Sequence, residues 1–290
     1  MLKLRLLALT TLALLMLGCS ASKDYLVVFH TPYGDMKAIL YEETPIHKKN
    51  FIELVQSGKY DSTTFHRVIA DFMIQGGDIN AKKDLEEEAQ IDYKLDQEIH
   101  DNYWHAKGAL AAARMGDNVN PEKKSSGSQF YIVDGQTYTE TELTQMAEGR
   151  LAQQKQAKIK ELLSMKKYAY LRNKVIEMQK SNDLEGLMNF MENKADSLVE
   201  AEFGEIELYK FSPEQMAIYA ETGGAPHLDG EYTVFGKVVE GLSVIDSIAS
   251  VKTLRADKPA EAIYMTVELE KIAKKNITKN YGYIYPTEEK

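Results

Sequence analysis

The most informative segment of this chain is residues 65–78, which read Phe-His-Arg-Val-Ile-Ala-Asp-Phe-Met-Ile-Gln-Gly-Gly-Asp. Side chains alternate along it in a way that predicts two short strands, ended by the pair of glycines. Arg67 and Gln75 occur in the same segment as the large apolar residues Phe72 and Met73. A fixed cation and an amide donor in an apolar wall suit a site that grips a peptide backbone without attacking it.

Two later segments extend this pattern. They are residues 127–133, Gly-Ser-Gln-Phe-Tyr-Ile-Val, and residues 228–238, Leu-Asp-Gly-Glu-Tyr-Thr-Val-Phe-Gly-Lys-Val. In this order the three segments resemble the cyclophilin-type peptidyl-prolyl cis-trans isomerases, over residues 25–135 and 225–272. Three ordered blocks are more specific than one short motif. The resemblance implies a mainly β fold, a closed eight-stranded antiparallel barrel capped by two helices.

The pattern outside these segments predicts the same fold class. Residues 25–30 and 36–41 are expected to form a hairpin, and residues 262–272 a closing strand. Thr44, as N-cap, opens a helix that stops at Gly58, and a second helix is expected over 241–251. We expect the inward residues to be Ile46, Phe51, Leu54 and Val55 in the first helix and Leu242, Val244, Ile245 and Ile248 in the second. Many short strands with two helices indicate a closed antiparallel barrel.

The activity implied by the resemblance is rotation of X–Pro peptide bonds. Such bonds prefer trans by only about 0.5–1 kcal/mol, yet they exchange over tens to hundreds of seconds. The reason is amide resonance, which raises a barrier of roughly 18–20 kcal/mol. A catalyst needs only to bind the twisted amide better than either planar form, so no nucleophile, metal or cofactor is required.

The resemblance also implies roles for individual residues. Arg67 would donate toward the prolyl nitrogen, whose lone pair is exposed by twisting, and Gln75 would hold the substrate carbonyl beside it. Gln129 and the backbone of Ala113 and Arg114 would position the residues before proline. The apolar proline pocket would consist of Phe72, Met73, Tyr131 and Leu228. The simpler alternatives are a surface ion pair for Arg67 and plain core packing for the apolar residues.

Several positions depart from the residues that are usual in the family. Arg114 stands where asparagine is usual and adds a charge at the groove, and Tyr131 replaces phenylalanine and places a hydroxyl in the pocket. His227 takes the position of a tryptophan found in cyclosporin-sensitive members, and Tyr232 that of a histidine. We therefore expect weak cyclosporin binding with catalysis retained. His66 alternates away from Arg67, so we expect it to be structural.

The first 18 residues resemble a bacterial lipoprotein signal peptide. Basic residues come first, an apolar run follows, and Leu-Gly precedes Cys19, the only cysteine. The run is shorter than the about 20 residues that span a bilayer. The resemblance implies cleavage before Cys19 and lipid attachment to it, with 19–24 as a polar tether; an incidental cysteine is the alternative. Ser20, where aspartate would favour retention at the inner membrane, favours the outer membrane with the domain in the periplasm.

The overall composition excludes some classes of function. The formal net charge of −9 and the sequence pI of about 5.3 argue against a nucleic-acid-binding protein, which would carry a basic surface. His100 and His105 have a spacing that suits no helical metal pair, so no metal site is expected. No phosphate-binding glycine loop or nucleophile–histidine arrangement occurs.

Residues 136–224 form the largest departure from the family, which usually has a short loop here. Thr139 and Glu142 match a capping box that begins a helix running to about Lys180. A second helix is expected over 183–204. Its predicted seam has the spacing of a short coiled coil and consists of Leu184, Met188, Met191, Ala195 and Leu198.

The charges of these helices favour a hairpin. Residues 150–180 hold nine lysines and arginines against two acidic residues, whereas 183–207 hold eight acidic residues against one lysine. We expect an arm over 139–207 that holds a client or docks a protein partner. Its adaptable apolar surface would come from Met165, Met178, Met188 and Met191, unless these methionines form the hairpin's own core. A third helix is expected to begin at Ser212.

The domain organisation that follows is a barrel over 25–135 and 225–275, a helical insertion over 136–224 and a tail over 276–290. The tail's alternating tyrosines, Tyr281, Tyr283 and Tyr285, either add an edge strand, pack on the barrel or belong to a loose end. Two functions remain open. One is isomerisation of X–Pro bonds in peptides and unfolded envelope proteins, and the other is a chaperone or scaffold with little or no isomerase activity.

Overall fold

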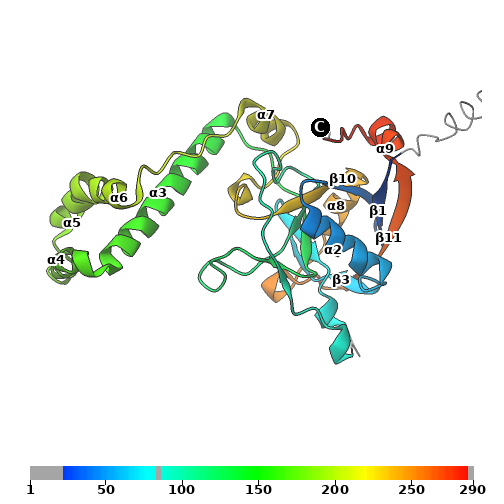
Figure 1. Cartoon of the computed structure of the whole chain (residues 1–290), viewed down its shortest axis with the longest axis horizontal. Helices are drawn as coiled ribbons and strands as arrows, with labels where there is room; N and C mark the ends of the chain where they lie inside the picture. The colour runs from blue at the N-terminus through cyan, green and yellow to red at the C-terminus, as the bar shows by residue number, and fades with distance from the viewer. Residues whose placement is uncertain (1–21, 83–85, 287–290) are drawn as a thin grey trace, which may run out of the picture. The chain divides into compact units, whose positions relative to one another are not determined.

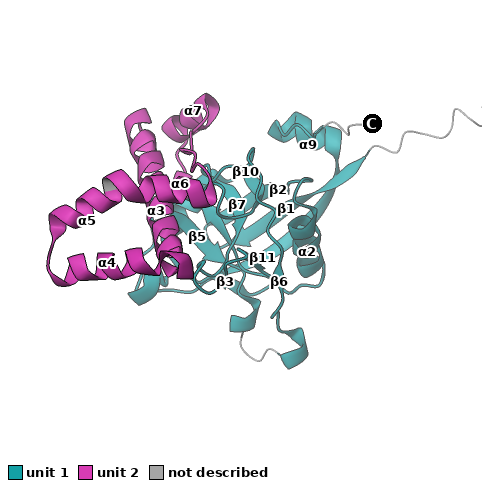
Figure 2. Ribbon diagram, turned by 60° about the vertical axis from the view of Figure 1, so that its left-hand side comes forward, with its two compact units in different colours: residues 1–136, 228–290 teal, residues 137–227 magenta. Residues whose placement is uncertain are grey.

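The computed structural model describes residues 22–82 and 86–286. The chain divides into two compact units, residues 1–136 with 228–290 and residues 137–227, called here the barrel unit and the helical unit (Figure 2). The predicted signal peptide, Cys19 and the start of the tether lie outside the described residues. Among the helices that are described, none has both the length and the apolar character needed to cross a membrane.

The barrel unit is built around a nine-stranded antiparallel sheet with the order β3-β11-β1-β2-β10-β7-β9-β5-β4. Its strands are β1 (Lys23–Thr31), β2 (Gly34–Leu40), β3 (Thr63–Phe65), β4 (Arg67–Ile69), β5 (Met73–Gly76), β7 (Ala109–Ala112), β9 (Phe130–Val133), β10 (Val234–Glu240) and β11 (Ile263–Ala273). A separate small pair joins β6 (Lys94–Leu95) and β8 (Ser125–Ser126). The mainly β fold expected from the sequence is confirmed.

The sheet is nearly closed into a barrel, because its two edge strands are consecutive in the chain. β3 ends at Phe65 and β4 begins at Arg67, so only His66 separates them. The His66 N–H donates to the carbonyl of Gln75 at 3.0 Å, which keeps this connection paired to β5. The predicted eight strands become nine because the predicted strand over residues 65–69 is divided at His66.

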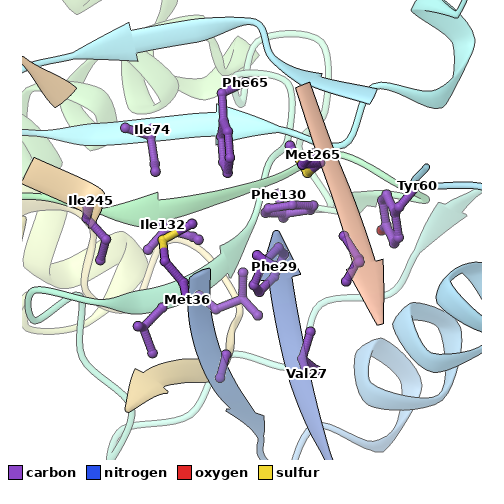
Figure 3. Packing of buried hydrophobic residues seen from close by; sticks show 14 of the residues in the cluster. Val27, Phe29, Met36, Tyr60, Phe65, Ile74, Phe130, Ile132, Ile245 and Met265 are labelled. Atoms are coloured by element: carbon purple, nitrogen blue, oxygen red, sulfur yellow. The ribbon is translucent and has the colours of Figure 1, made fainter. Parts of the chain in front are cut away.

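Phe130 lies at the centre of the barrel core (Figure 3). Its ring centroid is 5.6 to 6.4 Å from those of four other buried rings, Phe29, Phe51, Tyr60 and Phe65. Pairs of this kind contribute about 0.5–1.5 kcal/mol each beyond their area burial. Since side chains alternate along a strand, inward Phe130 turns the next residue, Tyr131, toward the outer face of β9.

Two helices pack on the barrel (Figure 1). α2 (Pro45–Gln56) buries His47, Phe51, Leu54 and Val55, and α8 (Leu242–Ala249) buries Val244, Ile245, Ile248 and Ala249. The inward orientation predicted for Ile46 and Leu242 was wrong, because these side chains are 44% and 40% exposed. Both belong to the first turn of their helix, and in α2 the inward place is taken by His47.

The N-terminus of α2 is capped by Glu98 and not by the predicted Thr44. Glu98 accepts hydrogen bonds from the backbone N–H groups of Ile46 and His47 at 3.0 and 2.9 Å. The Thr44 hydroxyl instead donates to the carbonyl of Tyr41. The cap was not visible in the sequence, because Glu98 lies more than 50 residues beyond the amides that it satisfies.

The tail packs on the barrel unit. After β11 the chain forms α9 (Lys274–Tyr281), and Tyr283 is then buried against Tyr41, with ring centroids 6.0 Å apart. The Tyr285 hydroxyl donates to Asp24 at 3.1 Å. Of the alternatives for the tail, packing on the barrel is therefore confirmed. The edge strand was wrong, because residues up to Tyr281 are helical and residues 282–286 form no strand.

The helical unit contains α3 (Glu140–Ser164), α4 (Ala169–Lys180), α5 (Leu184–Phe190), α6 (Asp196–Phe203) and α7 (Pro213–Glu221) (Figure 1). The capping box at Thr139 is confirmed, and so is the helix start at Ser212. α6 packs back on α3 and α5 on α4, which confirms a hairpin. Lys155 pairs with Asp196 at 2.6 Å, so the basic and acidic halves meet as expected.

The continuous helix predicted to Lys180 was wrong, because the chain breaks at Met165, which has an extended backbone. Leu162 and Leu171 explain the break. Nine residues apart in one α-helix, they would point in opposite directions. The break lets both enter one buried cluster with Ile159 and Phe190.

The predicted seam of the second helix was wrong for three of its residues. Leu184 and Met188 are about 60% exposed and Met191 is also exposed. A π-helical turn over Met191–Ala195 causes the difference, because it adds a residue to one turn and rotates the following helix. The buried positions are consequently Phe190, Ala195 and Val199.

Candidate active site

Three strands present the candidate side chains in one cross-strand row. In the sheet register Arg67 lies opposite Gln75, and Gln75 lies opposite Tyr131. The next residues along the three strands are buried in the core: Val68, Ile74 and Ile132. Because neighbours on a strand face opposite sides, the row Arg67–Gln75–Tyr131 lies on the outer face of the barrel.

This row borders a pocket in the barrel unit. The pocket is lined by Arg67, Phe72, Met73, Gln75, Ala113, Arg114, Tyr131, Leu228 and Tyr232. All nine were predicted as site residues. Gln129 lies next to the lining, because the Gln75 amide nitrogen donates to its side-chain oxygen at 3.2 Å. His227 is exposed, is assigned to the helical unit and is absent from the lining, so its role stays a prediction.

A strained turn between β4 and β5 brings Phe72 to the pocket. Asp71 has a left-handed backbone, with φ of 59°. Its N–H donates to the carboxylate of Asp134 at 2.9 Å, and the Phe72 carbonyl accepts from the N–H groups of Asp134 and Gly135. Hydrogen bonds to Asp134 therefore connect this turn to the end of β9, the strand that carries Tyr131.

Arg67 is held at its inner nitrogen by a residue that the sequence did not suggest. Its Nε donates to the carboxylate of Asp257 at 3.3 Å, across 190 residues of sequence. Both side chains are nearly half exposed. The alternative of a surface ion pair is therefore partly realised, but the same Arg67 side chain also lines the pocket.

Arg114 lines the pocket, as expected, and its charge is paired. Its side chain is 4% exposed and pairs with Asp117 at 2.5 Å and with Glu231 at 3.5 Å. Its guanidinium also lies 4.3 Å from the centre of the Tyr232 ring, as a cation–π contact. Arg114 thus supports the Tyr232 wall of the pocket, with its charge balanced by neighbouring carboxylates.

A buried chain of hydrogen bonds ends at the floor of the pocket. The Asp229 carboxylate accepts from both the N–H and the Nδ1–H of His105, at 2.8 and 3.0 Å. His105 Nε2 lies 2.9 Å from the Tyr131 hydroxyl, so with Nδ1 donating to Asp229 the Nε2 of the neutral ring accepts a hydrogen bond from that hydroxyl. Burial raises the pKa of Tyr131 well above its usual value, so it remains protonated.

The Tyr131 ring lines the pocket, as expected, and its hydroxyl has an internal partner in His105. Sequence reasoning missed both partners, since His105 and Asp229 are 124 residues apart and share no motif. Within the described ranges, the structure contains no group of three or more histidine, cysteine or acidic side chains placed to hold a metal ion.

Comparison with known proteins agrees with this geometry. The family model described as cyclophilin type peptidyl-prolyl cis-trans isomerase/CLD matches residues 26–166 and 212–268, more than half of the chain. The chain belongs to this family. A Staphylococcus epidermidis protein named "Putative peptidyl-prolyl cis-trans isomerase" is 30% identical over 84% of this chain and 91% of its own length. A Staphylococcus aureus protein with the same name is 29% identical over the same shares.

Solved structures give a more distant match. A crystal structure of a Cryptosporidium parvum cyclophilin type peptidyl-prolyl cis-trans isomerase has a TM-score of 0.48 and 20% identity, and the match covers 85% of this chain and 98% of that one. A second structure of that protein, described as in the presence of dipeptide ala-pro, has a TM-score of 0.47 and 19% identity, with 84% and 98% covered.

Proposed function

We propose that this protein catalyses cis-trans isomerisation of X–Pro bonds in peptides and unfolded proteins by non-covalent stabilisation of the twisted amide. The observation that carries the proposal is the row of Arg67 and Gln75 beside an apolar pocket, with both polar side chains in register on paired strands. Preorganised donors at such a site stabilise charge that develops only in the transition state. Membership of the cyclophilin family supports the same activity.

In this mechanism the proline ring enters the pocket between Phe72, Met73, Tyr131 and Leu228. Arg67 donates toward the prolyl nitrogen as twisting removes amide resonance and makes its lone pair available. Gln75 holds the substrate carbonyl, and its bond to Gln129 limits its rotation. No covalent step occurs, so the rate gain equals the preference of the site for the twisted amide over the planar one.

The test is exchange NMR on a short X–Pro peptide with the soluble domain and with Arg67→Ala. We expect at least about a tenfold loss of catalysis in the variant, equivalent to about 1.4 kcal/mol of transition-state binding. Arg67→Lys is the matched control, because it keeps the charge but loses the planar fork of donors. It should restore little of the catalysis that Arg67→Ala loses. Unchanged catalysis in Arg67→Ala would refute the proposed role of the arginine.

We also propose that Cys19 carries lipid and holds the protein at the outer membrane, with the barrel in the periplasm. The support is the sequence at residues 1–20 alone. Several acyl chains on one cysteine anchor stably, whereas one chain anchors weakly. Cys19→Ala should release the protein from the membrane fraction of the producing cells, and a protein that stays membrane-bound after this change would contradict the anchor.

A second candidate function is chaperone-like binding of unfolded chains by the helical unit. The observation that favours it is the exposure of large apolar side chains on α4, on α5 and at the start of the π-helical turn, namely Tyr170, Leu184, Met188 and Met191. Exposed methionines offer an adaptable surface to varied partners. This function and isomerisation reside in different units of the chain, so they are compatible.

A further inference from the structure

The contact between Arg67 and Asp257 has a geometry that bears on catalysis. The Asp257 carboxylate accepts a hydrogen bond from Nε of Arg67, the guanidinium nitrogen nearest the backbone. Of the residues described, Asp257 is the one whose side chain forms a hydrogen bond or ion pair with Arg67. A bond at Nε restricts rotation of the guanidinium group and leaves its two terminal nitrogens for another acceptor.

The loop that carries Asp257 is strained at this point. Residues 253–259 form a narrow loop, closed by a bridge between Thr253 and Pro259 and a bond from the Leu254 N–H to the Lys258 carbonyl at 2.7 Å. At its tip Ala256 and Asp257 are both left-handed, with φ of 60° and 58°. Residues other than glycine rarely adopt this conformation, because the Cβ atom crowds the backbone.

Two left-handed residues in succession, neither of them glycine, are an outlier that calls for a functional explanation. Aspartate tolerates the left-handed region better than most residues, so the strain is greatest at Ala256. In this conformation the Asp257 carboxylate lies within hydrogen-bond distance of Arg67, which is 190 residues earlier in the chain. The same contact is a weak source of stability, because both partners are nearly half exposed and water screens the pair.

We propose that Asp257 is a positioning residue for the isomerase, which orients Arg67 so that its terminal nitrogens face the pocket. This inference rests on the proposed function. A free arginine side chain samples many rotamers, and each misplaced rotamer removes the donor from the twisted amide. Asp257 acts through Arg67 and needs no contact with substrate.

The proposal is tested by a double-mutant cycle in the full-length protein, with turnover and KM measured separately on an X–Pro peptide. Asp257→Ala should lower turnover roughly tenfold with KM nearly unchanged, as expected for an interaction that acts in the transition state. Asp257→Asn, whose amide oxygen still accepts from Nε, should restore part of the loss. In an Arg67→Ala background, Asp257→Ala should have no further effect.

Glu240→Ala is the matched control, because Glu240 forms an exposed pair with Lys37 in the same unit at 3.0 Å. It should leave turnover unchanged. The positioning role is overturned if Asp257→Ala keeps wild-type turnover, or if it lowers turnover by the same factor with and without Arg67.

A spectroscopic signal separates this proposal from the proposed function. The Nε–H proton of Arg67 should exchange slowly with water in the wild type and quickly in Asp257→Ala. A wild-type protein without isomerase activity would refute the proposed function, and the Nε–H signal would then decide the positioning alone. Equal exchange rates of the Arg67 Nε–H proton in the wild type and in Asp257→Ala would overturn the positioning role of Asp257.

Discussion

Tyr131 connects the candidate site to the interior of the barrel unit. Its ring lines the pocket, while its hydroxyl bonds to His105, which is fully buried. Asp229, the last member of the chain, directly follows the pocket residue Leu228. The hydrogen-bonded chain Tyr131–His105–Asp229 therefore connects β9, which carries Tyr131, to the loop that carries the pocket residue Leu228.

Removing the Tyr131 hydroxyl should weaken the fold more than the chemistry. Tyr131→Phe keeps the ring in the pocket but leaves His105 Nε2 as a buried acceptor without a donor, which costs about 1–3 kcal/mol. Urea unfolding should show this loss, while isomerisation should remain within roughly threefold of wild type. Tyr264→Phe is the control, since Tyr264 is 56% exposed and should change stability by less than about 0.5 kcal/mol. A large loss of turnover in Tyr131→Phe would show that the hydroxyl acts in catalysis.

At the residue scale, the sequence predicted the lining of the pocket but not its supports. Arg67, Gln75 and Tyr131 belong to short segments whose alternation is local, so their shared face could be predicted before the structure was known. Asp257 and His105 reach the site only through the closed barrel. Asp257 is 190 residues from Arg67, and His105 is 26 residues from Tyr131 and 124 from Asp229, so no local pattern marks these contacts.

At the scale of elements, α2 links stability to pH. Burial lowers the pKa of His47 in spite of its hydrogen bond to Glu98. The neutral ring donates from Nδ1 to Glu98, and its Nε2 is buried without a partner, so protonation adds a buried N–H that nothing accepts. The stability contributed by neutral His47 is thus complete above the usual histidine pKa of about 6.5 and is lost as the pH falls below it.

Unfolding by urea at pH 7.5 and at pH 5.5 measures this effect. We expect lower stability at pH 5.5, with part of the difference removed in His47→Asn, because the asparagine amide can replace the Nδ1 donor and does not titrate. His66, whose pKa is also lowered by burial, contributes with the same sign, so some pH dependence should persist. An identical pH dependence in wild type and His47→Asn would contradict the role of His47.

The helical unit offers a direct comparison between the predicted seam and the observed core. Phe190→Ala should destabilise the unit by about 3 kcal/mol, because it empties a buried site. Met188→Ala, at a position of the predicted seam that is 60% exposed, should change stability by less than about 0.5 kcal/mol. Amide hydrogen exchange in α3 and α6 measures the unit separately from the barrel. The reverse ranking of the two variants would contradict the packing described.

The sequence predicts helices and strands where local signals mark them. It predicts less well the breaks that depend on how the helices pack. The capping boxes at Thr139 and Ser212 mark helix starts by residues three apart, and both are present in the structure. The break at Met165 and the π-helical turn after Phe190 have no such signal. They follow from the need of Leu162, Leu171 and Phe190 to share one cluster, which depends on the tertiary fold.

At the scale of the whole molecule, the division into two units predicts that isomerisation and client binding can be separated. Every residue that lines the pocket belongs to the barrel unit. Within the helical unit, Arg150 lies 4.7 Å from the centre of the Tyr209 ring, so the outgoing and returning chains meet there. Residues 151–207 can therefore be replaced by a short glycine–serine linker between two segments that are already close.

We expect this shortened protein to turn over a short X–Pro peptide within roughly twofold of wild type, because the donors and the pocket are unchanged. If the helical unit holds clients, the same variant should no longer suppress aggregation of an unfolded protein. The matched control is the full chain with Arg67→Ala, which should lose turnover and still suppress aggregation. Parallel losses of both activities in either protein would show that the two functions depend on one surface, and the division of labour proposed here would be wrong.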